Sequence, residues 1–273
     1  MSANRFSNNT RPLSISADEI HLWCIDDETI KDEYLLNAYH NLLNEAESIQ
    51  QKRFHFDKHR HQYLVARALV RSVLSRYSAD IAPKEWVFEK NQYGKPFITK
   101  VQLKLPLKFN LSHTDNMILL AVSLGNEVGV DVEPLSRNTH VLELASNIFT
   151  PDEYQQLLNL PDEHQKDRFF DLWTLKEAYI KACGMGLSIP LNEFTYDFPQ
   201  EGRINITFDP RRKDDPEQWH LWCLEANNTH KISLAIKNSD LNAKYTISLQ
   251  EVTPLSQIKT VDFSIAKKSK QYE

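Results

Sequence analysis

The stretch FFDLWTLKEAYIKACGMGL (residues 169–187) carries the most informative pattern in the chain, because charged residues recur in it at the spacing of one helical turn. At 3.6 residues per turn, Trp173, Glu177 and Lys181 lie on one stripe of a helix. Gly184 is expected to end that helix, since glycine readily adopts the left-handed closing conformation. A Glu–Lys pair at this spacing can also be only a surface pair, worth about 0.3–0.5 kcal/mol.

A second acidic motif, GVDVEP (129–134), lies upstream of this helix. Asp131 and Glu133 are two residues apart in a predicted strand, so their side chains leave the same face, while Val130 and Val132 face the core. Neighbouring carboxylates repel each other unless a cation lies between them. Oxygen-only ligands suit Mg²⁺. The motif therefore predicts a metal site, with a solvated strand end as the alternative.

The charged residues of the 169–187 helix can complete this site. Glu177 is the predicted third metal ligand, and the Lys181 ammonium can neutralise charge on a phosphoryl oxygen during transfer. Trp173 is interpreted as a packing residue. Lys176 projects about 100° away from Glu177, so it either reaches a phosphate from another side or lies in solvent.

Composition narrows the class of protein. The chain has 273 residues, 41% apolar and 25% charged, which is ordinary for a soluble globular protein of one large or two small domains. A formal charge of −5 argues against a nucleic-acid partner. Three scattered cysteines indicate neither a disulfide framework nor a zinc site. The chain lacks both a long apolar run and a signal-peptide core, so we expect a cytoplasmic protein without a membrane partner.

Hydrophobic periodicity and turn residues predict alternating strands and helices. Strands are expected at 19–25, 86–90, 116–124, 194–198, 204–208, 219–226 and 232–237, with 127–132 as the hairpin partner of 116–124. Helices are expected at 35–56, 61–77 and 166–183. A further helix should begin at Thr150, where Pro151 and Glu153 complete a capping box.

The order of these elements repeats once, as strand, long helix and strands, which indicates an internal duplication into two α+β halves. The tetrapeptide HLWC occurs at 21–24 and again at 220–223, which supports the same idea. We expect a cleft between the halves to be a natural ligand site. The predicted division is a disordered lead-in, an N-terminal subdomain, a C-terminal subdomain with the metal site, and a solvated tail, at 1–15, 16–126, 127–255 and 256–273.

Two further segments are candidates for holding phosphate. The chain has no GxGxxG, P-loop or GxSxG motif, so side chains and a metal must do this work. NLSH (110–113) is predicted to be a loop at the entrance to the next strand, where Ser112 and His113 can bind phosphate oxygens. The basic run KRFHFDKHRH (52–61) is either a solvated helix end or a grip for a small anionic ligand.

GVDVEP (129–134) and the 169–187 stretch resemble the motifs of the 4′-phosphopantetheinyl transferases of the larger, surfactin-synthetase-activating type. NLSHTDN (110–116), YGKPFI (93–98) and the 52–77 segment are similar as well. The resemblance implies an α+β monomer of two similar subdomains related by a pseudo-two-fold axis. It also implies transfer of 4′-phosphopantetheine from coenzyme A to a serine of an apo acyl or peptidyl carrier protein, releasing adenosine 3′,5′-bisphosphate.

The resemblance also assigns roles to single residues. Asp131, Glu133 and Glu177 fall on the family's Mg²⁺ ligands, with Mn²⁺ as the alternative ion. Glu177 is in addition the implied base for the serine hydroxyl. Lys181 falls on the lysine that contacts the transferred phosphate.

Coenzyme-A contacts are implied for four positions: Arg53, Lys95, Ser112 and His113, with His113 near the 3′-phosphate. Lysines that precede Arg53 in some relatives are here Glu47 and Gln50. This departure weakens the expected grip on the 3′-phosphate, for which the chain offers substitutes in Lys52, Arg53, Lys58 or Arg60.

Two other functions fit parts of the pattern. A carrier-protein-binding module without catalysis would bind the same partner, but the three acids and Lys181 are all present. A Mg²⁺-dependent phosphodiesterase or nuclease would also use acids and a lysine. That lysine usually follows an acid within two residues on a strand, whereas Glu133 is followed by Pro134 and Leu135.

Overall fold

The computed structural model describes residues 12–102, 104–137 and 139–269. Its α-helices are α1 (Glu33–His40), α2 (Glu45–Arg53), α3 (Asp57–Ser75), α4 (Val141–Ile148), α5 (Pro151–Leu158) and α6 (Asp162–Cys183). Its strands are β1 (Glu19–Ile25), β2 (Phe88–Lys90), β3 (Pro96–Ile98), β4 (Leu107–Thr114), β5 (Met117–Leu124), β6 (Val128–Pro134), β7 (Phe194–Asp197), β8 (Asn205–Phe208), β9 (Trp219–Glu225), β10 (His230–Lys237), β11 (Thr246–Thr253), β12 (Gln257–Thr260) and β13 (Ser264–Lys268). Short 3₁₀ turns are η1 (Asp27–Thr29), η2 (Pro83–Glu85), η3 (Lys100–Gln102), η4 (Gly186–Ser188), η5 (Leu191–Glu193) and η6 (Pro216–Gln218).

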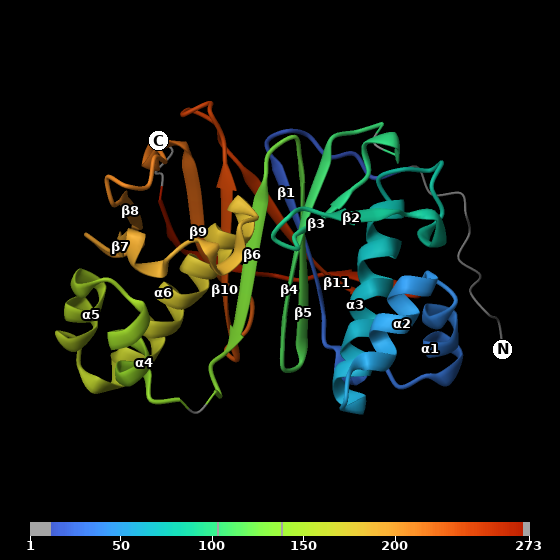
Figure 1. Ribbon diagram of the computed structural model, residues 1–273, viewed down its shortest axis with the longest axis horizontal. Coiled ribbons are helices and arrows are strands. Elements are labelled where there is room, and N and C mark those ends of the chain that lie inside the picture. The colour runs from blue at the N-terminus through green and yellow to red at the C-terminus, as the bar shows by residue number, and fades with distance from the viewer. Residues whose placement is uncertain (1–11, 103, 138, 270–273) are drawn as a thin grey trace.

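Two sheets occupy the middle of the molecule, with α1–α3 on one flank and α4–α6 on the other (Figure 1). The strand orders are β12-β11-β1-β5-β4 and β13-β9-β10-β6, and β2–β3 and β7–β8 form two small additional sheets. This is the predicted α+β class. None of the helices in the described ranges combines the length and apolar character needed to cross a bilayer.

The two halves repeat one plan. β1-β5-β4 and β6-β10-β9 match in order, and neighbouring strands in both sets are antiparallel. In the chain, each set is built as a strand, a long helix and a hairpin, with α3 and α6 as the helices. The two HLWC segments lie on β1 and β9, which hold different places in this correspondence. The arrangement of elements is therefore duplicated, but the two HLWC segments are not equivalent positions in the two halves.

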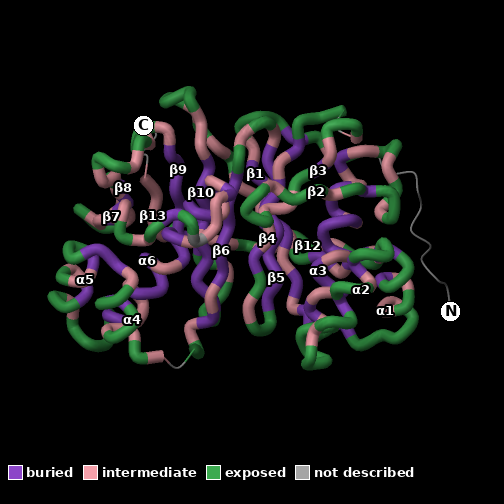
Figure 2. Tube along the Cα trace, viewed as in Figure 1, coloured by how far each residue is buried: buried purple, intermediate pink, exposed green. Residues whose placement is uncertain are grey.

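Buried segments follow the strands of both sheets (Figure 2), and the buried apolar side chains of the described residues form three cores. One lies between α3 and the first sheet and includes Trp23 and Leu69. A second lies between α6 and the other sheet and includes Leu175. The third lies between the two sheets and contains Val130 and Val132, as predicted. The alternate residues of β6 are thereby left to face α6.

Glycines fix two positions near the site. A Cβ added to Gly129 would lie 2.0 Å from the Ala178 carbonyl oxygen, so α6 rests directly on β6. Gly184 has φ of 68° and caps α6, which confirms the predicted helix end. The predicted capping box of α5 is also present, with Thr150 and Glu153 bonding to each other's backbone N–H groups.

Several local predictions are wrong for identifiable reasons. The single helix expected at 35–56 is two helices, because Asn44 starts α2 with a capping box to Glu47. The expected hairpin between β5 and β6 does not form, because β1 and β4 already pair with both edges of β5. β6 pairs with β10 instead. The NLSH loop is part of β4, where Ser112 and His113 point to opposite faces.

The chain ends also differ from expectation within the described residues. The segment expected to be a solvated tail forms β12 and β13 in 256–269. β11 and β12 extend the sheet of the N-terminal half, so 127–255 is not one contiguous subdomain. In the expected disordered lead-in, Ile15 is buried and the Leu13 N–H donates to the Arg76 carbonyl at 2.6 Å. The rest of these two predictions falls on 1–11 and 270–273, outside the described residues.

Candidate active site

The site forms where β4, β6 and α6 meet, at the junction of the two halves. The Lys181 ammonium donates to Asp131 Oδ1 at 2.6 Å and to Ser112 Oγ at 2.8 Å. Ser112 Oγ in turn donates to Asp131 Oδ1 at 2.8 Å. Strand β4 is held beside β6 by Asn110, whose side-chain oxygen accepts the Val130 N–H at 2.9 Å. Three of the predicted site residues, from three different elements, are thus in direct contact.

Glu133 is held from two sides. Trp173 Nε1 donates to Glu133 Oε1 at 3.1 Å, and an Arg137 guanidinium nitrogen donates to Glu133 Oε2 at 2.9 Å. Trp173 also stacks on Phe169, with ring centroids 6.3 Å apart. The interpretation of Trp173 as a packing residue is therefore incomplete, because its indole N–H also orients a site carboxylate.

The site carries excess negative charge. Burial raises the pKa of Glu177, and the Asp131 charge raises it further while Lys181 opposes the shift. Burial and Asp131 likewise raise the pKa of Glu133. Asp131 Oδ2 is buried and has no hydrogen-bond partner among the described residues. A buried, unpartnered carboxylate oxygen beside two further acids fits a hard divalent cation.

In this structure, the carboxylates of Asp131 and Glu133 pair with basic side chains of the protein itself. In the described ranges, no three His, Cys, Asp or Glu side chains are grouped closely enough to hold a metal ion. Lys181 and Arg137 are the nearest cationic partners of Asp131 and Glu133.

A pocket of about 770 Å³ opens beside the acids, between α3, β4 and the end of β6. Four of its lining residues are basic or can become so: His59, Arg67, His113 and Arg137. Desolvation of the ring and the positive charges of Lys181 and Arg67 lower the pKa of His113. Such a wall suits a phosphate-bearing ligand.

Arg67 is a site residue that sequence reasoning missed. Burial lowers its pKa, and its Nε has no hydrogen-bond partner in the described part of the chain. Its guanidinium lies 5.7 Å from the centre of the Tyr63 ring. His59, Tyr63 and Arg67 recur every four residues on α3, and this spacing is the signal that could have identified them.

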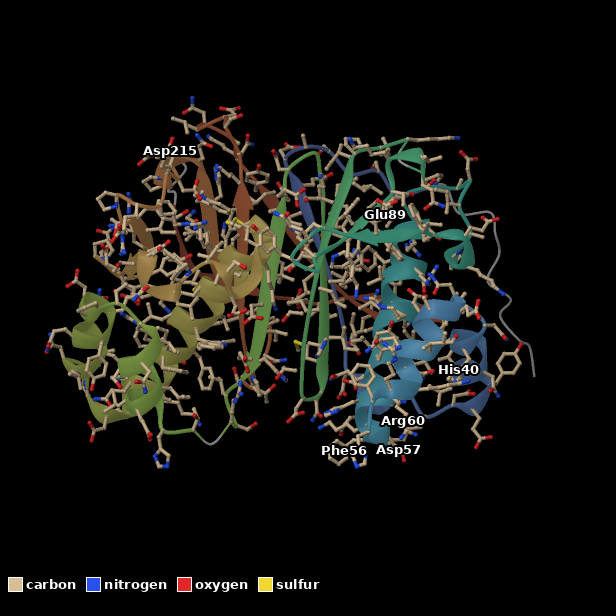
Figure 3. The ribbon with its side chains drawn as sticks, in the orientation of Figure 1. His40, Phe56, Asp57, Arg60, Glu89 and Asp215 are labelled. Carbon is tan, nitrogen blue, oxygen red and sulfur yellow. The ribbon has the colours of Figure 1, made fainter. Side chains whose placement is uncertain are left out.

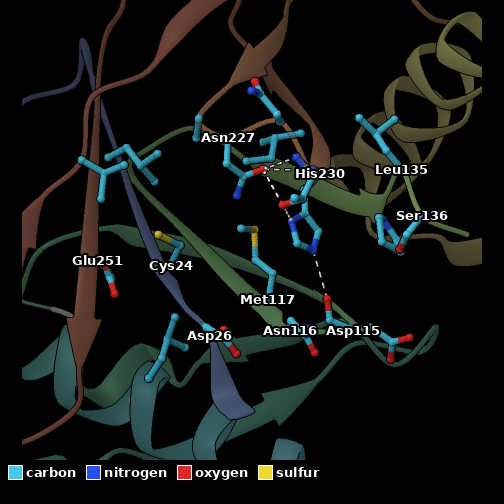
Figure 4. Close-up of a pocket in the computed structure, with 18 residues that line it drawn as sticks. Cys24, Asp26, Asp115, Asn116, Met117, Leu135, Ser136, Asn227, His230 and Glu251 are labelled. Atoms are coloured by element: carbon cyan, nitrogen blue, oxygen red, sulfur yellow. Dashed lines mark hydrogen bonds between the residues drawn. The ribbon is translucent and has the colours of Figure 1, made fainter. Parts of the chain in front are cut away.

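A second pocket, of about 680 Å³, lies between the two sheets and shares Asp115, Pro134 and Ser136 with the basic pocket (Figure 4). His230 is fixed in it by a 3.0 Å contact from Nε2 to the Asp115 carbonyl. Carboxylates, including Glu251, line this pocket, so it disfavours an anion.

The remaining predicted contacts lie apart from this centre. Lys95 reaches the end of α6, where its ammonium bonds to Glu127 at 2.8 Å and to the Ala182 carbonyl at 3.0 Å. Arg53 is exposed at the end of α2. Glu47 is half of a buried ion pair with Arg71 at 2.7 Å.

The basic run 52–61 is largely engaged with the protein itself. Lys58 pairs with Asp115 at 2.8 Å on the rim of the basic pocket, and Arg60 donates to two backbone carbonyls. Phe56 is exposed next to Asp57 and Arg60 at the start of α3 (Figure 3). Lys52 and Arg53 are exposed to solvent, and His59 of the same run lines the basic pocket.

Lys176 is neither a phosphate contact nor solvated, contrary to both sequence interpretations. It is fully buried, pairs with Glu153 at 2.9 Å, and donates to the carbonyls of Leu191 and Phe194 at 2.7 Å each. It therefore ties α6 to α5 and β7.

Comparisons with known proteins find one family along most of the chain. Residues 127–236 match the model of the 4′-phosphopantetheinyl transferase superfamily, and residues 30–125 match the model described as 4′-phosphopantetheinyl transferase, N-terminal. The chain is 36% identical over 176 residues to the 4′-phosphopantetheinyl transferase HetI of Nostoc sp., covering 64% of this chain and 73% of the relative. It is 31% identical over 206 residues to Sfp of Bacillus subtilis, covering 74% of this chain and 85% of the relative.

Among solved structures, the holo-[acyl-carrier-protein] synthase of Thermotoga maritima aligns with 41% of this chain and 62% of its own, at 19% identity and a TM-score of 0.34. That likeness is too slight to carry an argument. The family models and sequence relatives confirm the expected family and enzyme class. The chain belongs to the 4′-phosphopantetheinyl transferases, enzymes that transfer phosphopantetheine to apo carrier proteins.

Proposed function

We propose that this enzyme takes 4′-phosphopantetheine from coenzyme A and attaches it, with Mg²⁺, to a serine of an apo acyl or peptidyl carrier protein. The observation that carries the proposal is the contact of Ser112, Asp131 and Lys181 next to a basic pocket. The contact places the Asp131 carboxylate, which can bind a cation, beside the Lys181 ammonium, which can bind a phosphate. The adjacent pocket offers space for a donor with several negative charges.

Asp131, Glu133 and Glu177 would hold the Mg²⁺ ion, or Mn²⁺ in its place. The unpartnered Oδ2 of Asp131 and the raised pKa values of both glutamates support this assignment. When bound, the ion would polarise the diphosphate oxygens and balance their charge.

Glu177 would be the base for the incoming hydroxyl. The serine oxygen forms a bond to the phosphorus that bears pantetheine, and its proton passes to Glu177. The phosphoanhydride bond breaks, and adenosine 3′,5′-bisphosphate leaves. Lys181, already fixed on Ser112 and Asp131, would donate to an oxygen of the transferred phosphate.

The basic pocket would hold the nucleotide end of coenzyme A. Arg67, Arg137 and His59 would face its phosphates, together with the predicted contact His113. With its lowered pKa, the His113 imidazole would act as a neutral hydrogen-bonding group. Ser112 would add a hydroxyl. Lys95 and Arg53 remain proposed contacts at the periphery.

We further propose a cytoplasmic monomer that binds neither nucleic acid nor membrane. Net negative charge and three free cysteines support that setting.

The test is a panel of purified apo carrier proteins incubated with the enzyme, coenzyme A and Mg²⁺, followed by intact-mass measurement. We expect a gain of one phosphopantetheine that disappears without coenzyme A or with a chelator. Modification that persists in the chelator would contradict the metal role. No gain on any of several unrelated carriers would contradict the proposed donor and acceptor.

A further inference from the structure

We propose that the N-terminal half contains a second anion-binding pocket, centred on Arg76, that is the internal counterpart of the active site. This inference does not depend on the proposed mechanism. It rests on the duplicated plan of the fold, on an unpartnered guanidinium and on the walls around it.

A buried ion pair aligns the two halves residue by residue. In each half, a fully buried cation on the long helix pairs with the capping-box glutamate of the preceding helix. The pairs are Arg71 with Glu47 at 2.7 Å and Lys176 with Glu153 at 2.9 Å. Both cations also donate to backbone carbonyls of the segment that follows their helix. The shared contacts set the register between α3 and α6.

In this register, Arg76 is the counterpart of Lys181, because each lies five residues beyond its buried cation. Ser72 correspondingly takes the place of Glu177. On the strand that faces the helix, β1 packs Trp23 against α3 where β6 presents acids to α6. The counterpart therefore keeps a cation but lacks the carboxylates of the active site.

Arg76 lines a pocket of about 680 Å³ between the end of α3, the following loop and the β11–β12 turn. Its guanidinium forms no hydrogen bond or ion pair within 12–102, 104–137 and 139–269, and its Nε is buried. The guanidinium carbon lies over the Trp23 ring, 5.9 Å from its centre, in a cation–π contact. Four residues with hydroxyl groups line the same pocket, from three segments: Ser72, Ser78, Thr253 and Ser256. The Ser72 hydroxyl donates to the Ala68 carbonyl.

Two acids also line this pocket, and both already have partners. Asp80 pairs with Lys104, and the Glu85 carboxylate accepts the Ala82 N–H at 2.7 Å. Within the described residues, neither carboxylate forms an ion pair with Arg76. Apolar side chains such as Val252 complete the wall. A cation, hydroxyls and an apolar wall suit a small carboxylate or phosphate that carries an apolar group.

The experiment is an amide NMR titration of the full chain with two probes, inorganic phosphate and butyrate, at constant ionic strength. We expect saturable shifts for amides in 72–80 and 252–258. Loss of a hydrogen bond to a charged group should weaken this binding at least about tenfold in Arg76→Gln. Arg211→Gln, which removes an exposed arginine elsewhere, should leave it unchanged.

Binding at the active site is distinguished by its own amides, near 112–113 and 181, and by Lys181→Gln. If Arg76→Gln does not fold, Ser256→Tyr blocks the mouth of the pocket from an exposed position and should abolish the same shifts. Absence of saturable shifts in 72–80 and 252–258, or shifts that persist in these variants, would overturn the proposal. Shifts confined to the active-site amides would overturn it as well.

Discussion

The two halves of this enzyme share an arrangement of helix and strands but differ in the side chains at the helix–strand contact. In both, a long helix lies on a three-strand unit and is anchored by a buried cation, Arg71 or Lys176. The strand facing α3 contributes Trp23 to an apolar core, whereas the strand facing α6 contributes Asp131 to a charged site. The comparison indicates that a few side chains at the helix–strand contact decide whether the same architecture forms an apolar core or a charged site.

The largest expected effect is on the helix position that differs most between the halves. Glu177→Ala should lower the rate of carrier modification by about 10²–10⁴-fold, because it removes the base while leaving the α6 packing intact. Glu163→Ala, an exposed change on the same helix, is the matched control. Initial rates and circular dichroism of both variants test this. A Glu177→Ala enzyme with wild-type turnover would remove Glu177 from the mechanism.

The next effect compares the two anchors. Lys176→Met should destabilise the protein by about 3–5 kcal/mol, because it leaves the buried charge of Glu153 without its partner. Arg71→Met should cost less, because the Glu47 side chain is 11% exposed and that of Glu153 is 0% exposed. Urea unfolding of the two variants measures the difference. Adding Glu153→Gln to Lys176→Met should recover part of the loss, and an unchanged or greater loss would refute the account.

A smaller effect is expected at Asp27, a buried acid of the N-terminal half. Both its carboxylate oxygens are without a hydrogen-bond partner among the described residues, and burial raises its pKa above the ordinary 3.8. A raised folded-state pKa gives stability that is present at low pH and lost as pH rises through that pKa. Asp27→Asn cannot ionise, so it should be about 1 kcal/mol more stable than wild type at neutral pH.

Thermal unfolding of Asp27→Asn and wild type across the acidic range checks this prediction. The gain should shrink as pH falls toward and below the ordinary value. A constant gain at every pH would mean that the effect is one of packing rather than charge.

The smallest effect is expected for the ion pair between Arg137 and Glu133 in the C-terminal half. Arg137→Gln frees Glu133, so Mg²⁺ alone should bind about threefold more tightly, as expected for loss of an ion pair whose arginine is 56% exposed. Coenzyme A without metal should bind more weakly, because Arg137 also lines the basic pocket. Calorimetry with Arg211→Gln as the control separates these opposite changes. Equal shifts in the affinities for Mg²⁺ and for coenzyme A would contradict the idea that Glu133 leaves Arg137 to bind the metal.

Sequence patterns predicted the site better than they predicted the pairing of strands. The spacing in GVDVEP and along α6 is local, so Asp131, Glu133, Glu177 and Lys181 could be placed on faces before any fold was known. Lys181 meets Asp131 because α6 rests directly on β6 at Gly129, and Ser112 joins them because Asn110 holds β4 beside β6. Sequence alone indicated neither of these contacts. The basic pocket was missed because Arg67 looks like an ordinary surface arginine until β4 and β6 enclose it.

Burial of charge and long-range pairing were beyond sequence reasoning. For Lys176 the pattern offered a phosphate contact or a place in solvent, because lysines are rarely buried, whereas it pairs with Glu153 of another helix. β12 and β13 are short and partly exposed, so 256–273 was interpreted as a solvated tail. The partner of β11 is far away in the chain, as in the pairing of Glu19 with Thr246, and no local pattern records such a contact.

The parallel pairing of β11 with β1 ties the order of synthesis to the order of folding. β1 is among the earliest strands to leave the ribosome, but its neighbour on one side is made more than two hundred residues later. Until then, that side of β1 is an open edge that can pair with another chain. The nascent N-terminal half is therefore the region in which a chaperone, or a second nascent chain, has the longest opportunity to bind.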